Sequence, residues 1–358
     1  MKPAAFSPRT FFITAVTVVV ILSAAAWGLW LAAAAQYRHV IDGWITQGRA
    51  DGYHISYDDR RIFGFPRHIV MRLSNLDWKN TDGIAFHADA IDIAVTPWNW
   101  HDYQARFKNN VTLQAPTDDA GHALTLATDK GIADVTLAPD GTWKRAKLQL
   151  DNAKLGLAPH YLFAAAALDA SVSRPDTPPQ NHRQPGLTID GDATGLTLPD
   201  AMPLPFGPAA NHVAVTMRVM GRVPDVRERA DVAAWNNDSG VVEFDKLDID
   251  WGVLQMTSTG TMGFDDDLQP EGAFSGTIAD PDRVMQALMK GGYVAARDAG
   301  MLDAAMKLFA KPAQGKDGQG MEFPITVQLG GLFFGPVRVF TFPAIEWPEA
   351  PPATASSS

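Results

Sequence analysis

The sequence predicts a mainly β (α+β) protein: an N-terminal transmembrane helix, then curved antiparallel sheets, with a helical hairpin in the C-terminal half. Three observations favour this fold class. A long uncharged apolar stretch lies near the N-terminus, and many later segments alternate apolar and polar residues with a period of two. Clear helical periodicity returns only late in the chain.

The apolar stretch, Phe11 to Ala35, contains 25 residues without a charge. As a helix it is roughly 37 Å long, enough to cross a hydrocarbon core of about 30 Å with some tilt. Residues 1–10 contain Lys2 and Arg9 and should be cytoplasmic by the positive-inside rule. We therefore expect residues 11–35 to be a single-pass inner-membrane anchor and the bulk of the chain to lie in the periplasm.

A cleaved signal peptide is the alternative for this stretch, because Ala33-Ala34-Ala35 fits the small-x-small cleavage pattern. Signal peptides usually have an apolar region of only about 7–15 residues, which favours an uncleaved anchor. A helical stripe from Tyr37 to Ile45 then continues the anchor and should end before Asp51. Both alternatives place residues 36–348 outside the cytoplasm.

The first strand after the helix shows a change of phase. Ile69, Met71 and Leu73 alternate with polar residues, whereas Leu76 has the opposite parity, which predicts a bulge near Asn75. Later segments with apolar residues on one face lie at residues 147–151, 187–190, 213–219, 246–251 and 325–329. Alternation of this kind is typical of antiparallel sheets with one wetted face.

Helical signals are few. Asp280 can cap a helix that begins at Pro281 and ends at Gly291, and a second helix is expected over residues 294–310; together they form the predicted hairpin. The alanine-rich segment His160 to Asp169 is a third candidate helix.

Proline-rich stretches at residues 174–186 and 199–208 are either linkers or long loops. They permit two halves within the exported part, residues 36–173 and 187–348. The tail, residues 349–358, is predicted to be disordered.

Composition and motifs exclude several functions. The net charge of −10 repels nucleic acid, and the absence of cysteine excludes thiolate catalysis and Cys-ligated zinc. No nucleophile-elbow, zincin, dinucleotide or P-loop spacing occurs. His87 with Asp89, and His101 with Asp102, are too few ligands for a metal site. We therefore expect no catalytic residues, metal or cofactor, and a non-enzymatic protein.

Tryptophans are the more informative side chains. Four of them lie in or beside predicted strands and could line an open apolar groove: Trp78, Trp143, Trp251 and Trp347. The alternative is that they are ordinary core residues between layers.

Several short motifs resemble an uncharacterised alphaproteobacterial envelope family, domain-of-unknown-function family 2125. The residues that carry the resemblance are Gly64-Phe65-Pro66, Pro97-Trp98-Asn99, Trp251-Gly252 and Gly335-Pro336, with a closing Phe342 to Pro348. These motifs are structural, so the resemblance implies no catalytic residues. The chain has Arg67 where phenylalanine is commoner in the family. The pattern is also similar in architecture to AsmA-like proteins, which implies lipid handling on the concave face of a sheet.

The expected function is therefore envelope lipid handling or envelope maintenance by a membrane-anchored periplasmic protein with an apolar β-groove. Two alternatives stay open at this point: a scaffold that binds another envelope protein, and a hydrolase with a dispersed site.

Overall fold

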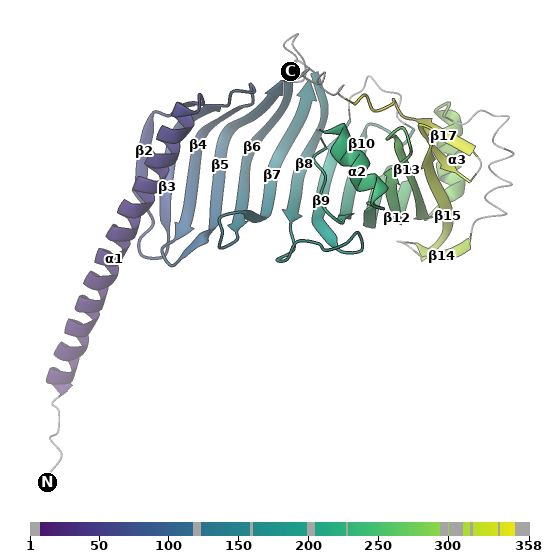
Figure 1. Ribbon diagram of the computed structural model, residues 1–358. Coiled ribbons are helices and arrows are strands. Elements are labelled where there is room, and N and C mark those ends of the chain that lie inside the picture. Colours follow the sequence, from purple (N-terminus) through teal and green to yellow (C-terminus); the bar gives the residue numbers. More distant parts are fainter. Residues whose placement is uncertain are drawn as a thin grey trace, which may run out of the picture. The chain divides into compact units, whose positions relative to one another are not determined.

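The computed structural model describes residues 8–116, 123–157, 160–198, 205–226, 228–293, 300, 311–315, 318–335 and 337–347. The chain is mainly β, and every strand pairing within the described residues is antiparallel, as the alternation predicts. It divides into two compact units, Met1–Trp143 and Lys144–Ser358. Figure 1 labels most elements of both units.

Unit 1 consists of one long helix and a sheet of sequential strands. Its elements are α1 (Pro8–Ala50), β1 (His54–Ser56), β2 (Asp59–Phe63), β3 (Ile69–Lys79), β4 (Ala85–Thr96), β5 (Asn99–Pro116) and β6 (Ala123–Leu137). The strands pair in the order β2-β3-β4-β5-β6, and β1 pairs with the far end of β3.

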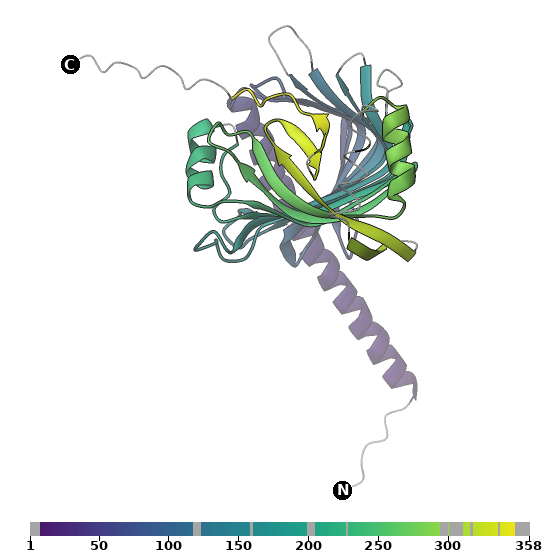
Figure 2. The same cartoon turned by 90° about the vertical axis from the view of Figure 1, so that its right-hand side faces the viewer.

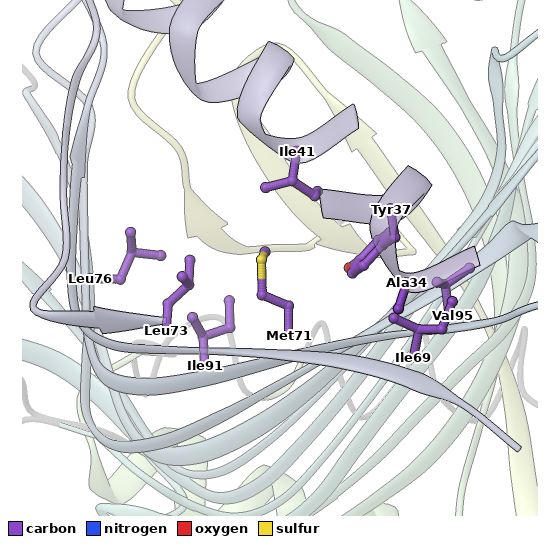
Figure 3. Packing of buried hydrophobic residues seen from close by; sticks show 9 residues of the cluster. All are labelled: Ala34, Tyr37, Ile41, Ile69, Met71, Leu73, Leu76, Ile91 and Val95. Carbon is purple, nitrogen blue, oxygen red and sulfur yellow. The ribbon is translucent and has the colours of Figure 1, made fainter. Parts of the chain in front are cut away.

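Helix α1 is continuous through the predicted anchor and the stripe that follows it. Side chains from Val20 to Leu29 are exposed, whereas Ala34, Tyr37 and Ile41 are buried against the sheet. Figure 3 shows these three residues facing apolar side chains of β3 and β4. The helix is long and apolar enough to cross a membrane, by length and composition.

The phase change in β3 is confirmed. Asn75 has a φ of 50°, in the left-handed region, and Leu73 and Leu76 are buried in the same cluster although they are three positions apart. The register of β3 with its neighbours continues across Asn75: β3 pairs with β2 up to Ser74 and with β1 from Asp77 onward.

Unit 2 contains the remaining strands and two shorter helices. Its elements are β7 (Trp143–Leu157), which begins at the last residue of unit 1, β8 (His160–Ser173), β9 (Pro185–Thr197), β10 (Ala209–Met220), α2 (Arg229–Asn237), β11 (Val242–Trp251), β12 (Leu254–Phe264), β13 (Pro270–Ile278), α3 (Pro281–Lys290), β14 (Lys311–Gly315), β15 (Gly318–Gln328), β16 (Gly331–Phe334) and β17 (Val337–Thr341). In the described part of unit 2, strands that follow one another in the chain pair with each other, except that β13 pairs with β15 and not with β14. Strand β14 pairs with β15, which also pairs with β16. Figure 2 shows the strong curvature of these strands.

The predicted helical hairpin is not supported as a whole. Its first helix is α3, where the Asp280 side chain accepts a hydrogen bond from the Arg283 amide and Pro281 is the first helical residue, as expected. The second helix, residues 294–310, lies outside the described residues except for Gly300. The predicted disordered tail, residues 349–358, also lies outside them.

One further expectation differs from the structure. The segment His160 to Asp169 is strand β8, because pairing with β7 and β9 outweighs the helix propensity of its alanines. Residues 174–186 connect β8 to β9, which pair directly, and the two compact units meet at residues 143 and 144.

Candidate functional site

An apolar cavity of about 360 Å³ lies in unit 2, between the inner face of the sheet and helix α3. Strand alternation builds its floor, because Leu247, Ile249 and Trp251 of β11 line the cavity, whereas the alternating residues, the buried Asp248 and the half-buried Asp250, do not. The lining residues are Pro205, Phe206, Leu247, Ile249, Trp251, Leu254, Met256, Ser258, Phe274, Val284, Leu288, Tyr293, Ile325, Val327, Leu332, Phe334 and Phe340.

Helix α3 closes one side of the cavity with its apolar stripe. Val284 and Leu288, one turn apart, are buried against the strands, while the opposite side of the helix faces outward. The stripe is the one that the sequence predicts. Tyr293, just beyond the C-terminal end of α3, extends the same wall.

A short segment, residues 205–207, is held over the β11 end of the cavity by Trp251 and Gly252. The Trp251 indole donates a hydrogen bond of 2.8 Å to the Gly207 carbonyl and packs edge-on against the Phe206 ring, with ring centres 5.2 Å apart. Gly252 has a φ of 58°, and a Cβ there would lie 2.3 Å from the Phe206 carbonyl oxygen. Only glycine allows this close approach.

The side chains that line the cavity are almost all apolar. Among the described residues that line it there is no carboxylate, imidazole, ammonium or guanidinium group. The Ser258 hydroxyl donates to the Ser275 carbonyl at 3.0 Å, so its hydrogen-bonding capacity is used within the wall. Such a lining suits an apolar ligand, and apart from the Tyr293 phenol it offers no side chain that commonly takes part in acid-base chemistry.

Residues 30–343 match the family described as "Uncharacterized protein conserved in bacteria (DUF2125)". The chain belongs to the DUF2125 family. No curated protein and no solved structure matches the chain. The match to this family confirms the family part of the sequence resemblance.

Two motifs of this DUF2125 chain are turns at the same end of the unit 1 sheet. Gly64, Phe65 and Pro66 connect β2 to β3, and Pro97, Trp98 and Asn99 connect β4 to β5. The pairing of Ile69 with Val95 brings the two turns side by side. The first turn therefore follows two short strands and does not lead directly out of the helix.

Gly64 is required by its turn. Its φ is 112°, and a Cβ would lie 2.7 Å from the His68 carbonyl oxygen. In the second turn the Asn99 side chain donates to Asp102 at 2.6 Å and accepts from the His101 amide at 3.1 Å. Gly335 has a φ of 55° in the turn between β16 and β17, and Pro336 lies outside the described residues.

The four tryptophans that were expected to line one groove have different surroundings within their own units. Trp251 lines the unit 2 cavity, whereas Trp78 lies in unit 1 and packs against Tyr53, with ring centres 5.8 Å apart. Trp143 is the first residue of β7. Trp347 donates to the Leu268 carbonyl at 3.1 Å and packs against Phe264, so it fixes the segment after β17 to unit 2.

His87 of the DUF2125 chain lies in a second hollow, of about 440 Å³, in unit 1 with His54, Asp77 and Thr112. Its Nδ1 lies 2.8 Å from Asp77 and its Nε2 lies 3.3 Å from Asp89, and the bond to Asp77 is the main reason that the pKa of His87 is raised. Both ring nitrogens therefore face carboxylates, which leaves neither for the hydroxyl that a hydrolase would activate.

His101 is exposed, and Asp102 beside it accepts from Thr136 at 2.7 Å. No group of three or more His, Asp or Glu side chains able to hold a metal ion occurs in the part of the DUF2125 chain that the structure describes.

Sequence reasoning missed most of the cavity wall. Phe206 falls in a proline-rich stretch with no periodicity, and Phe274, Leu332 and Phe334 fall in strands whose inner faces are known only once the sheet is built. The two sequence signals that could have located the cavity are the Trp251-Gly252 pair and the apolar stripe of α3.

Proposed function

We propose that the protein is a non-enzymatic, membrane-anchored carrier that holds an apolar ligand, of the lipid acyl class, in the unit 2 cavity. The single observation that carries the proposal is the cavity itself, about 360 Å³ in volume and walled by apolar side chains. Volumes of this order are typical of small-molecule sites.

The energetics of lipid transfer favour such a cavity. Each methylene group moved from an apolar environment into water costs about 0.8 kcal/mol, so a carrier must offer continuous apolar surface to an acyl chain. Phe206, Trp251 and Phe274 supply large aromatic surfaces at low entropy cost, and Leu288 and Ile325 supply aliphatic ones.

The proposed location follows from helix α1 and the charges that precede it. A single apolar helix with Lys2 and Arg9 before it suits an anchor in the bacterial inner membrane, with both units in the periplasm. The function in this setting is envelope lipid handling or envelope maintenance, and the curved sheet is compatible with an AsmA-like architecture. The described cavity lining has no carboxylate, imidazole, ammonium or guanidinium group, and its one ionisable side chain is the Tyr293 phenol, which favours binding over catalysis.

The test is native mass spectrometry of the full-length protein, purified gently from its own host membrane, followed by lipid extraction. We expect stoichiometric lipid or fatty acid. Val327→Phe adds volume inside the cavity and should expel the ligand, whereas Val253→Phe makes the same change on the exposed β11–β12 turn and should retain it. A folded wild-type protein without lipid would contradict the proposal.

A scaffold for another envelope protein is the second candidate. Exposed apolar side chains gather around β17, where Phe340 and Phe342 pack edge-on with ring centres 5.1 Å apart and Leu329 and Ile345 are also exposed. Exposed apolar groups of this kind are typical of protein interfaces. This candidate would be favoured if the wild-type protein carries no lipid and co-purifies with a stoichiometric protein partner, and if the Phe342→Asp variant no longer binds that partner.

A further inference from the structure

Large aromatic side chains are exposed at one end of unit 1, although side chains of this type are usually buried. Trp98 is 71% exposed, Phe65 is 44% exposed, and Trp27 on α1 is 54% exposed. Phe65 and Trp98 lie in the two adjacent turns that follow β2 and β4. Indole rings are enriched at the level of lipid headgroups, because one edge is apolar and the other donates a hydrogen bond.

These aromatic side chains are held in place by contacts to their neighbours. The Trp30 indole donates to the His68 carbonyl at 2.8 Å and packs edge-on against Phe65, with ring centres 5.9 Å apart. The Trp100 indole donates to the Pro97 carbonyl at 3.1 Å. The two turns are thus fixed to α1 and to their own strands, while Trp98 points away from the core.

The length of α1 places these turns at a membrane surface. Side chains are exposed as far as Leu29, and contact with the sheet begins at Trp30. From Phe11 to Leu29 the helix contains 19 uncharged residues, which span roughly 28 Å. A bilayer core is about 30 Å thick. When Phe11 lies at one boundary of the core, Trp30 and the two turns lie at the other.

The polar residues of the turns fit the same position. Arg67, His68 and His101 are exposed beside Phe65 and Trp98, in a chain whose net charge is −10. Cationic and imidazole side chains at this level can meet lipid phosphates while the aromatic rings enter the acyl boundary.

We propose that residues 64–68 and 96–101 form a membrane-docking collar, in which Phe65 and Trp98 insert into the outer interface of the bilayer that α1 crosses. The collar fixes the depth and tilt of the unit 1 sheet. This inference rests on the membrane anchoring in the proposed function and is independent of what the unit 2 cavity binds.

The absence of cysteine from the chain allows the test, since single cysteines can be labelled uniquely. Full-length Trp98→Cys, Phe65→Cys, Leu29→Cys and Asp82→Cys are labelled with NBD and reconstituted into phosphatidylcholine vesicles, with or without doxyl-labelled phosphatidylcholine. Leu29 reports on the anchor, and Asp82 is exposed in the turn at the opposite end of β3 and β4. The measured quantities are the quenching and the blue shift of NBD emission.

We expect the labels at residues 98 and 65 to be quenched at least half as strongly as the label at residue 29, and the label at residue 82 to show no quenching. If the label at residue 29 is quenched but the labels at residues 98 and 65 are unquenched, like the label at residue 82, the collar is overturned and the anchor is not. An unquenched label at residue 29 would overturn both. Two collar positions keep the test valid if one variant fails to fold.

Discussion

Asp92 is a buried carboxylate on the polar face of β4, between Ile91 and Ile93, whose side chains take part in the apolar packing under α1. Both of its oxygens accept hydrogen bonds of 2.6 Å from Arg72 on β3, and Lys108 on β5 lies 3.6 Å away. The bond to Arg72 holds the pKa of Asp92 below its ordinary value, against the opposing effect of burial.

We predict that Asp92→Asn destabilises unit 1 by about 1–2 kcal/mol, because Arg72 loses a bidentate partner but stays partly hydrated. The measurement is urea unfolding in detergent. Asp59→Asn is the matched control, since Asp59 pairs with Arg61 on the surface and its loss should cost under about 0.5 kcal/mol. Equal effects of the two changes would contradict the prediction.

The difference between wild type and Asp92→Asn should depend on pH with a defined sign. A carboxylate whose pKa is lowered on folding stabilises the fold above its unfolded pKa of about 3.9 and loses that effect as the pH falls through the folded value. The two unfolding curves should therefore differ at neutral pH and converge in acid. A difference that grows in acid would contradict this assignment.

Gly252 offers a second prediction at this scale. Gly252→Ala places a Cβ against the Phe206 carbonyl oxygen at positive φ, and should cost about 1–3 kcal/mol and release residues 205–207 from the cavity. Limited proteolysis after residue 205 measures the release. Gly141→Ala is the control, because Gly141 also has positive φ but its Cβ would meet no atom within 4 Å.

At the level of elements, the docked part of α1 is a core element of unit 1. Its stripe of Ala34, Tyr37 and Ile41 covers β3 and β4, and the Tyr37 hydroxyl donates to the Ile93 carbonyl at 3.3 Å. Burial raises the pKa of Tyr37, so the phenol stays protonated. The sheet would otherwise expose Ile69, Met71 and Val95 to water.

We therefore predict that Ile41→Asp destabilises unit 1 by at least about 3 kcal/mol, through loss of packing and burial of a charge. Hydrogen exchange of β3 amides should accelerate in this variant. Trp44→Asp on the exposed side of the same helix should leave the exchange of β3 unchanged. Unchanged protection in Ile41→Asp would show that the sheet does not need the helix.

The strands could be predicted from the sequence where alternation was clear. Residues 147–151, 187–190, 213–219 and 246–251 all lie within strands, and α3 has the predicted cap. The failure at β8 has a physical cause: small alanines on both faces remove the period of two, and only pairing with neighbours identifies the strand. Helix α2 was missed because it has only 9 residues and its N-cap residue, Glu228, makes no side-chain cap hydrogen bond.

The cavity could be predicted only in outline. One-sided strands and Trp251 indicated an apolar inner surface, but the members of the wall come from segments far apart in the chain, from Pro205 to Phe340. Their association depends on strand order and on the turn at Gly252, which period-two patterns do not encode. Trp78 and Trp251 lie in different units, so their grouping in one groove stays a prediction.

For the whole molecule, the decisive feature is whether α1 resides in a membrane. Leu22→Arg places a charge in the middle of the apolar stretch and should cost about 3 kcal/mol of insertion free energy, which raises the share of protein extracted by alkaline carbonate. Trp44→Arg is the control, because Trp44 is equally exposed but lies beyond the docked part of the helix that begins at Trp30. Identical extraction of both variants would contradict the anchor.

Helix α1 runs without interruption from Pro8 to Ala50, so the segment that suits a bilayer and the segment that packs on the sheet are one rod. A flexible tether would let the folded part sweep a hemisphere and reach distant targets. In the proposed membrane setting, a continuous helix would instead hold unit 1 at one fixed height, and encounters with other molecules would occur by diffusion in the plane of the membrane. Any partner that exchanges ligand with this protein would then have to reach that height by itself.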